Sequence, residues 1–327
     1  MPGTRPSVDE VRTVVELAAL APSVHNSQPW RFRWDGAALE VREETRRALP
    51  VLDPSGRERV LSCGAAVLGA RLGFAEVGWS ARAELLPGGD VLARVVPEER
   101  RDPGADEHDL AAAAARRATD RDPYDDRPLP DDVLASLRAA AEAEGAWLHV
   151  VDRDRQEPDL DVLLAHADAS QRSDPQYLAE LDSWRTSSGP VGVADRALPT
   201  VPASERGDSL SLRDFDAARA APARPGGERR PEHPAVLVVG TDGDDRRDWL
   251  VAGAALHRLL LTATVAGVAA QPITSVLEVP PLRARLRTVL GLVGVPQVVL
   301  RAGYGTHGPS SSRLPVDEVL EIAVPGS

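Results

Sequence analysis

Apolar residues recur at helical spacing in two stretches of the chain that resemble each other. Residues 9–21 (DEVRTVVELAALA) align with residues 131–143 (DDVLASLRAAAEA) at an offset of 122 (131 − 9), with an Asp, a Val and two Ala in common. Both patterns predict an amphipathic helix. Ser7 and Glu10 predict a capping box for the first helix, and Pro130 suits the first turn of the second.

A second pair of stretches follows in the same order. Residues 63–81 (CGAAVLGARLGFAEVGWSA) align with residues 252–270 (AGAALHRLLLTATVAGVAA) at an offset of 189 (252 − 63). Strand-like runs come after both, at 91–96 and 297–304. Each match alone is weak in a chain rich in Ala, but two matches in the same order indicate an internal duplication.

The two offsets differ by 67 residues (189 − 122), which predicts an insertion of about that length in the second half. Composition places it at 185–230, a segment rich in Pro, Gly, Ser and charge that follows a helical pattern at 159–184. Such a segment is either disordered or a functional lid, and its scattered apolar residues favour a lid. We therefore expect two pseudo-symmetric halves, 1–105 and 106–327, with a lid insertion at about 185–230.

Composition and charge exclude several classes of protein. Apolar residues are 43% of the 327 residues, enough for a substantial core, although aromatic residues are only 4%. The net charge of −12 argues against a nucleic-acid or anionic-membrane partner. The apolar run at 251–270 is broken by His257 and Arg258, which fits a buried helix better than a membrane span. The single cysteine, Cys63, cannot form an internal disulfide, and the first residues lack the apolar core of a signal peptide, so we expect a cytoplasmic protein with Cys63 in its core.

A polar cluster stands where the predicted elements need only a short connection. Residues 21–30 (APSVHNSQPW) place a hydroxyl, an imidazole and two amides between a helical run and the strand-like run at 31–34. A plain turn needs one or two polar residues, not a cluster closed by a rigid Pro-Trp pair. We therefore expect these polar groups to face a ligand.

Three side chains at alternate positions precede the second repeat. Arg117, Thr119 and Arg121 share one face if the segment is extended, and two guanidinium groups with a hydroxyl suit a phosphate or another polyanionic group. A further arginine, Arg313, lies among the hydroxyls of residues 310–315 (SSSRLP). The alternative for each arginine is a solvated side chain paired with a nearby Asp. The repeat favours a site, because each half carries a motif that the other lacks, as if a symmetric dimer had been fused and had lost one of its two sites.

Together these segments resemble the FMN-dependent nitroreductase superfamily. The matching residues are APSVHNSQPWRF (21–32), the Arg-x-Thr-x-Arg run (117–121) and the C-terminal SRLP…DEV (312–319), and the resemblance covers nearly the whole chain except the predicted lid. The fused form with a long insertion is similar to the Acg-type nitroreductase-like proteins. The resemblance implies an α+β nitroreductase-like fold in one chain, with one FMN between two pseudo-symmetric halves. This fused pseudo-dimer would be a monomer or a weak homodimer.

The resemblance also implies roles for the residues at matching positions. Arg117, Thr119 and Arg313 would hold the phosphate and ribityl chain of FMN, and Arg121 would lie near N1 and O2 of the ring, where a positive charge favours the reduced cofactor. The cofactor-binding residues implied in this way are Pro22, Ser23, Val24, Asn26, Gln28, Arg117, Thr119, Arg121, Pro272, Ile273, Thr274, Ser275, Ser311 and Arg313.

The chain departs from the family pattern in two places. Thr274 and Ser275 stand where the family has the Glu and Gly of a loop beside flavin N5, and Ser311 stands where a Lys is frequent. Backbone donation to N5 survives the first change, but a carboxylate that helps to bind nicotinamide does not. His25 lies at a position that varies in the family, so we interpret it as a residue that fills the loop.

Two functions remain open. In the first, NAD(P)H is a transient reductant and FMN passes electrons to nitro or quinone acceptors, with no catalytic residue required from the chain. In the second, the protein binds or stores FMN without turnover, and the lid closes over the face where nicotinamide would stack. The activity of the family favours the first function, and the missing Glu and the lid favour the second. No G-x-S-x-G, C-x-x-C or H-E-x-x-H motif supports a hydrolase or a metal site.

Overall fold

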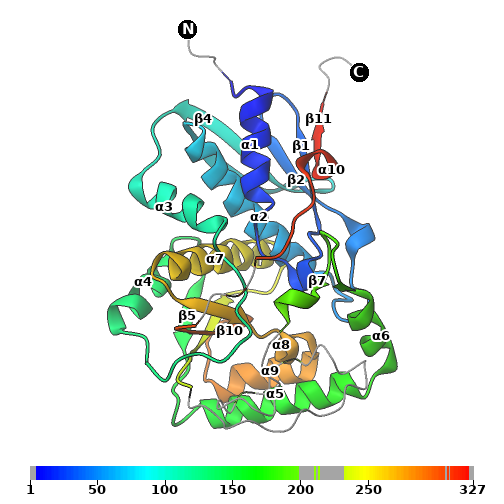
Figure 1. Cartoon of the computed structure of the whole chain (residues 1–327), viewed down its shortest axis with the longest axis vertical. Coiled ribbons are helices and arrows are strands. Elements are labelled where there is room, and N and C mark those ends of the chain that lie inside the picture. Colours follow the sequence, from blue (N-terminus) through cyan, green and yellow to red (C-terminus); the bar gives the residue numbers. More distant parts are fainter. Residues whose placement is uncertain are drawn as a thin grey trace.

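Two long helices pack against each other between two β-sheets, and further helices cover the outer face of the second sheet (Figure 1). The computed structural model describes residues 5–198, 210, 213, 232–305, 308 and 310–323. Helices and strands are mixed along the chain, so the fold class is α+β, as the sequence predicted.

The first sheet combines four N-terminal strands with one strand from the C-terminus. Its order is β11-β1-β2-β4-β3, in which β11 runs parallel to β1 and the other pairs are antiparallel. Phe32 of β1 lies between Leu320 of β11 and Val41 of β2. The strands are β1 (Trp30–Trp34), β2 (Leu39–Glu43), β3 (Trp79–Gly88), β4 (Val91–Arg100) and β11 (Leu320–Ile322).

The second sheet has the strand order β5-β8-β10-β9, with all pairs antiparallel. Its strands are β5 (Trp147–Val150), β8 (Ala235–Thr241), β9 (Ala269–Pro272) and β10 (Val295–Gly303). Taken in chain order, this is the order β1-β2-β4-β3 of the first sheet. The repeated topology agrees with the expected duplication, which stays a prediction.

The boundary expected at residue 105 does not separate the two sheets completely. Residues 106–327 were expected to form the second half, but β11 lies beside β1 in the first sheet (Figure 1). The last segment of the chain therefore returns across the molecule, and on its way it carries residues 310–315 past the loop that follows the first helix.

Helices form where the apolar pattern predicted them, and further helices form where the sequence analysis predicted none. The capping box of Ser7 and Glu10 is present at the start of the first helix, and the predicted pattern at 159–184 forms two helices. None of the helices in the described part of the chain is both long and apolar enough to cross a bilayer. The helices are α1 (Val8–Ala18), α2 (Arg57–Glu76), α3 (Ala105–Ala114), α4 (Asp131–Glu142), α5 (Glu157–Arg172), α6 (Pro175–Ser183), α7 (Arg246–Val265), α8 (Ser275–Glu278), α9 (Pro280–Val289) and α10 (Val316–Val319), with short 3₁₀ turns η1 (Val24–Asn26), η2 (Thr45–Arg47) and η3 (Asp195–Ala197).

Helices α2 and α7 approach each other closely because glycine stands at both sides of their crossing. A Cβ on Gly64 would collide with the carbonyl oxygen of Leu250, and a Cβ on Gly253 would collide with that of Leu61. Cys63 is fully buried beside this crossing and belongs to the core, as expected. The contact joins the two sheets through their central helices and fixes the position of each relative to the other.

Only the beginning of the predicted lid insertion is described. Two short strands, β6 (Arg185–Thr186) and β7 (Val193–Ala194), pair in parallel, and Val193 is buried against α6. Leu210 is buried in the core around the second sheet, and Arg213 is described as well. Most of the remaining insertion, residues 199–209, 211–212 and 214–230, lies outside the described residues, so the lid stays a prediction.

Candidate functional site

The polar loop after α1 has an unusual backbone. His25, Asn26 and Gln28 have φ angles of 49°, 52° and 50°, in a region that residues other than glycine rarely adopt. Two other segments of the chain hold this loop in place, because Nδ2 of Asn26 lies 3.0 Å from the carbonyl oxygen of Pro190 and 3.1 Å from that of Ser312. Such strained backbone is typical of functional sites, where the surrounding structure maintains it.

The side chain of Gln28 joins this loop to two other segments of the chain. Its side-chain amide donates to the carbonyl oxygen of Pro190 (2.7 Å), and its Oε1 accepts from the backbone N–H of Leu314 (2.9 Å). Gln28 is fully buried and lines neither of the cavities described below. The structure therefore places this predicted cofactor-binding residue behind the loop, where it ties together three segments that are distant in sequence.

Two arginines converge on the loop from other parts of the chain. Arg313 donates to the carbonyl oxygens of Ala19 (2.8 Å) and Leu20 (3.1 Å) and to Oδ1 of Asn26 (2.9 Å). Arg117 is 7% exposed, and its Nε has no hydrogen-bond partner among the described residues. In the part of the chain that the structure describes, neither arginine forms a salt bridge with a carboxylate.

These two guanidinium groups are electrostatically unfavourable as they stand. Burial lowers the pKa of Arg117 to about 10, and burial together with the charge of Arg117 lowers the pKa of Arg313 to about 9. Both shifts show that positive charge lies in poorly hydrated surroundings without a counter-charge. An anion placed here would gain charge-assisted hydrogen bonds from Arg117. Arg313 would add the attraction of its charge, because its N–H groups already donate to Asn26 and to backbone carbonyl oxygens.

The segment from Arg117 to Arg121 is attached to the second sheet. Thr119 forms an isolated parallel bridge with Ala270 of β9, and the backbone N–H of Asp120 donates to the carbonyl oxygen of Ala270 (3.3 Å). Arg121 donates from Nη1 to the carbonyl oxygen of Ala197 (2.9 Å). The second sheet therefore presents this segment to the polar loop of the first half.

Two adjoining cavities lie between these segments. The first, here called the main cavity, is lined by the polar loop, the start of α2 and the segment after β9. The second, here called the arginine recess, contains Arg117, Arg313, Asn26 and Ser311. The two cavities share Pro22, Ser23, His25, Thr119 and Arg121.

Thirteen of the fourteen predicted site residues line this pair of cavities, all except Gln28. Their role as cofactor ligands stays a prediction. Those in the main cavity are Pro22, Ser23, Val24, Thr119, Arg121, Pro272, Ile273, Thr274 and Ser275, and those found in the arginine recess alone are Asn26, Arg117, Ser311 and Arg313.

The sequence interpretation missed a charged cluster in the main cavity. His25, interpreted as filling the loop, lines both cavities, and its Nε2 lies 2.9 Å from Nη1 of Arg213. The other guanidinium nitrogen of Arg213 donates to Oε1 of Glu278 (2.6 Å), and Oγ1 of Thr274 donates to the same carboxylate oxygen (2.6 Å). Burial and the charges of Arg213 and Arg121 hold the pKa of His25 well below its usual value, so the imidazole is neutral.

No sequence signal pointed to these contacts, because Arg213 lies in the insertion and Glu278 follows the predicted loop by three residues. The carboxylate that Thr274 lacks is supplied nearby by Glu278, whose side chain is 1% exposed. Among the described residues, no cluster of His, Cys, Asp and Glu has the geometry of a metal site.

The chain is similar to several known proteins. A family model described as "Nitroreductase family" matches residues 114–304. Two proteins of Mycobacterium tuberculosis carry the name "Putative NAD(P)H nitroreductase", one followed by Rv3131 and the other by acg. The first is 35% identical to this chain over 332 residues, which cover 97% of this chain and 92% of the relative. The second is 31% identical over 334 residues, which cover 98% of both chains.

Solved structures show a more distant likeness. An FMN- and NADPH-dependent nitroreductase, NfnB from a Sphigopyxis species, is 19% identical and covers 65% of this chain, with a TM-score of 0.39. A nitroreductase with bound FMN from Bacteroides fragilis is 16% identical and covers 61% of this chain, with a TM-score of 0.35.

Proposed function

Since the chain belongs to the nitroreductase family, we propose that it binds one FMN and passes electrons from NAD(P)H through this cofactor to nitro or quinone acceptors. The observation that carries the proposal is the arginine recess, where Arg117 and Arg313 bring two positive charges together without a salt-bridging carboxylate among the described residues. A phosphate group would supply the missing negative charge.

The residues present fit FMN in other respects. Thr119 provides a further donor for the phosphate of FMN, and so does Nε of Arg117, which has no hydrogen-bond partner among the described residues. The main cavity offers apolar walls for a flat ring, from Pro22, Val24 and Ile273 among others. Arg121 lines both cavities, where its charge would act on the ring edge nearest to the phosphate end. A bound FMN would supply the chemistry of accepting hydride and passing electrons on, and the chain would bind and orient it.

A second function is favoured by one observation. Arg213, which belongs to the insertion, extends into the main cavity and is held there by His25 and Glu278. A side chain held in this way occupies space that a nicotinamide would need beside the ring. The alternative is therefore a protein that binds or stores FMN without turnover.

The binding of the FMN phosphate can be tested separately from the binding of the flavin ring. Titration with FMN and with riboflavin, which lacks only the phosphate, should show FMN binding at least tenfold more tightly, because the phosphate alone can pair with Arg117 and Arg313. Equal affinities would show that the arginine recess is not a phosphate site.

The two functions differ in the response of the FMN-loaded protein to NAD(P)H without oxygen. Rapid bleaching of the flavin absorbance in the full chain would support the oxidoreductase and exclude the storage function. Stable absorbance in the full chain, with bleaching in Arg213→Ala, would support storage and identify Arg213 as the group that blocks hydride transfer.

A further inference from the structure

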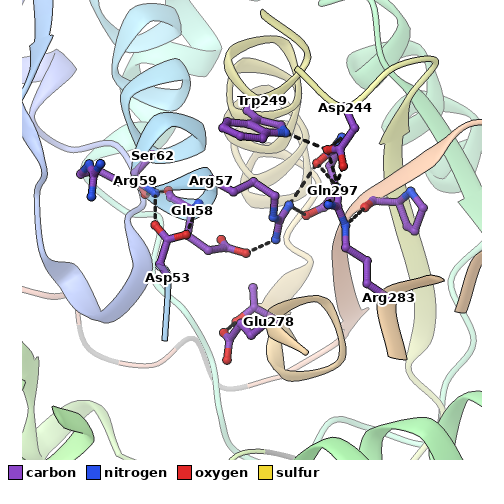
Figure 2. Close-up of polar contacts among 12 residues, drawn as sticks. Asp53, Arg57, Glu58, Arg59, Ser62, Asp244, Trp249, Glu278, Arg283 and Gln297 are labelled. Atoms are coloured by element: carbon purple, nitrogen blue, oxygen red, sulfur yellow. Dashed lines mark hydrogen bonds and ion pairs between the residues drawn. The ribbon is translucent and has the colours of Figure 1, made fainter. Parts of the chain in front are cut away.

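A third space, here called the outer cleft, lies on the far side of the main cavity. It is formed by the turn before α2, the start of α2 and helices α8 and α9, and its charged residues include Asp53, Glu58, Asp244, Glu278 and Arg283. Figure 2 shows the Glu58 carboxylate of α2 facing the guanidinium of Arg57, which in turn contacts Gln297 of β10. Gln297 also contacts Arg283 of α9 and Asp244, which precedes α7.

Glu58 occupies a position shared by no other described residue, because it alone lines both the main cavity and the outer cleft. Its backbone is fixed at the start of α2, where its N–H donates to Oδ1 of Asp53 (3.1 Å) and its carbonyl oxygen accepts from Oγ of Ser62 (2.7 Å). Its side chain is only 5% exposed. A carboxyl group at this position separates the enclosed cavity from the more open cleft.

We propose that Glu58 is the proton donor of the main cavity: its carboxyl group gives a proton to an acceptor that is reduced there and regains one from water in the outer cleft. The inference rests on the proposed flavin site. A quinone that receives hydride gains two electrons and one proton, and its second oxygen needs one more proton to give the hydroquinone. Glu58 supplies that proton from its Oε–H bond, becomes a carboxylate, and is reprotonated by water from the cleft.

The charges around Glu58 suit this role. Burial, together with the neighbouring carboxylates of Glu278 and Asp53, raises the pKa of Glu58 to about 7. Arg57, which donates a hydrogen bond to the Glu58 carboxylate itself, and Arg213 act in the opposite direction. Arg57 also donates to the backbone carbonyl oxygen of Gln297 (2.8 Å) and to its Oε1 (3.0 Å). A carboxyl group that is partly protonated near neutral pH can both donate and accept a proton.

Glu278, a second carboxylate near Glu58, forms hydrogen bonds with different partners. Glu278 accepts hydrogen bonds from Arg213 (2.6 Å), Thr274 (2.6 Å) and Nε2 of Gln171 (2.6 Å). These three donors occupy both carboxylate oxygens of Glu278. Glu278 therefore raises the proton affinity of Glu58 and holds Arg213, while Glu58 carries the proton.

The test compares wild-type protein with Glu58→Gln, which keeps the shape and removes the titrating proton. Both are loaded with FMN, reduced with dithionite and mixed with benzoquinone in a stopped-flow instrument between pH 5 and 9. We expect wild-type reoxidation to slow as the pH rises through about 7, and Glu58→Gln to be at least tenfold slower at pH 6 with no such dependence. Glu44→Gln, which removes a buried carboxylate that lines none of these spaces, should behave like the wild type.

A measurement without turnover completes the test. Infrared difference spectra of the wild-type protein should show a carboxyl C=O band that disappears as the pH rises through about 7, and Glu58→Gln should lack this band. If Glu58→Gln does not fold, the wild-type titration and the Glu58→Asp variant decide. Unchanged reoxidation in Glu58→Gln, or no carboxyl band that titrates near pH 7, overturns the proton-donor role while FMN binding stands. Failure of the wild-type protein to bind FMN at all overturns the proposed function and this inference together.

Discussion

At the scale of a single residue, the buried charge of Arg117 lowers the stability of the folded protein. Its guanidinium is buried next to that of Arg313, and no acidic group among the described residues offsets the charge. The chain therefore maintains an unfavourable charge in the free protein that becomes useful when an anion binds. Residues conserved for binding commonly reduce stability in this manner.

Arg117→Met should separate the two effects. Burial lowers the pKa of Arg117 from its usual value to about 10, so the folded state disfavours the charge at every pH below about 10, and the cost fades as the pH rises above about 10. At neutral pH the full cost applies, and its removal should stabilise the FMN-free protein by up to about 3 kcal/mol. The same change should weaken FMN binding by about 1.5–3 kcal/mol, the usual loss for a charge-assisted hydrogen bond. Thermal unfolding without FMN and fluorescence titration with FMN measure the two values.

Arg172→Met serves as the control, because Arg172 pairs with Asp168 on the partly exposed surface of α5 (2.7 Å). It should change neither quantity by more than about 0.5 kcal/mol. If both variants bind FMN equally well, Arg117 is not part of the cofactor site.

At the scale of elements, the crossing of α2 and α7 determines how the two halves meet. Gly253→Ala would place a methyl group against the carbonyl oxygen of Leu61, on backbone that cannot move without shifting the whole helix. We expect a destabilisation of about 3 kcal/mol, at the upper end for overpacking, together with weaker FMN binding because the site lies between the halves. Chemical denaturation and FMN titration test this.

Gly104→Ala is the matched control for that substitution. Gly104 has an ordinary φ of −66°, and the nearest atom to an added Cβ is a side-chain oxygen of Glu107 at 3.4 Å. A small change in Gly104→Ala and an equally small change in Gly253→Ala would show that the helices can move apart without cost.

The sequence predicted most helices and the strand-like runs because their apolar residues are periodic over short distances. The repeat located α2 and α7 well, since Gly64 and Gly253 align in both copies. By contrast, the pairing of β11 with β1 joins segments about 290 residues apart, and no local pattern indicates such a pairing. The segments that line the site were predictable for the same reason as the helices, because motifs are local.

The remaining site residues were not predictable because their roles arise only from packing. Gln28 belongs to the motif in sequence, but its backbone turns its amide toward Pro190 and Leu314. Glu58 looks in sequence like one of many acidic residues at the start of a helix. Its significance comes from burial and from Glu278, which lies 220 positions away (278 − 58).

At the scale of the whole molecule, the arginine recess draws on three separate parts of the chain. Asn26 comes from the first half, Arg117 from the connection between the halves, and Arg313 from the C-terminal segment that returns to the first sheet. One chain therefore supplies the arginine recess without a second subunit, although its two sheets share the same strand order. The strand order that the two sheets share is not matched by two equal sites.

This asymmetry predicts one FMN for each chain. The segment that aligns with the polar loop, residues 143–152, reads AEGAWLHVVD and has lost the hydroxyl-amide cluster, so the position related by the repeat lacks half of a binding site. Native mass spectrometry of the reconstituted protein should show one FMN per chain, and titration of Arg117→Met with FMN should show a single binding phase of lower affinity, with no second phase at the wild-type affinity. Two FMN per chain, or a second binding phase that Arg117→Met leaves unchanged, would mean that the second half of the molecule also forms a complete site.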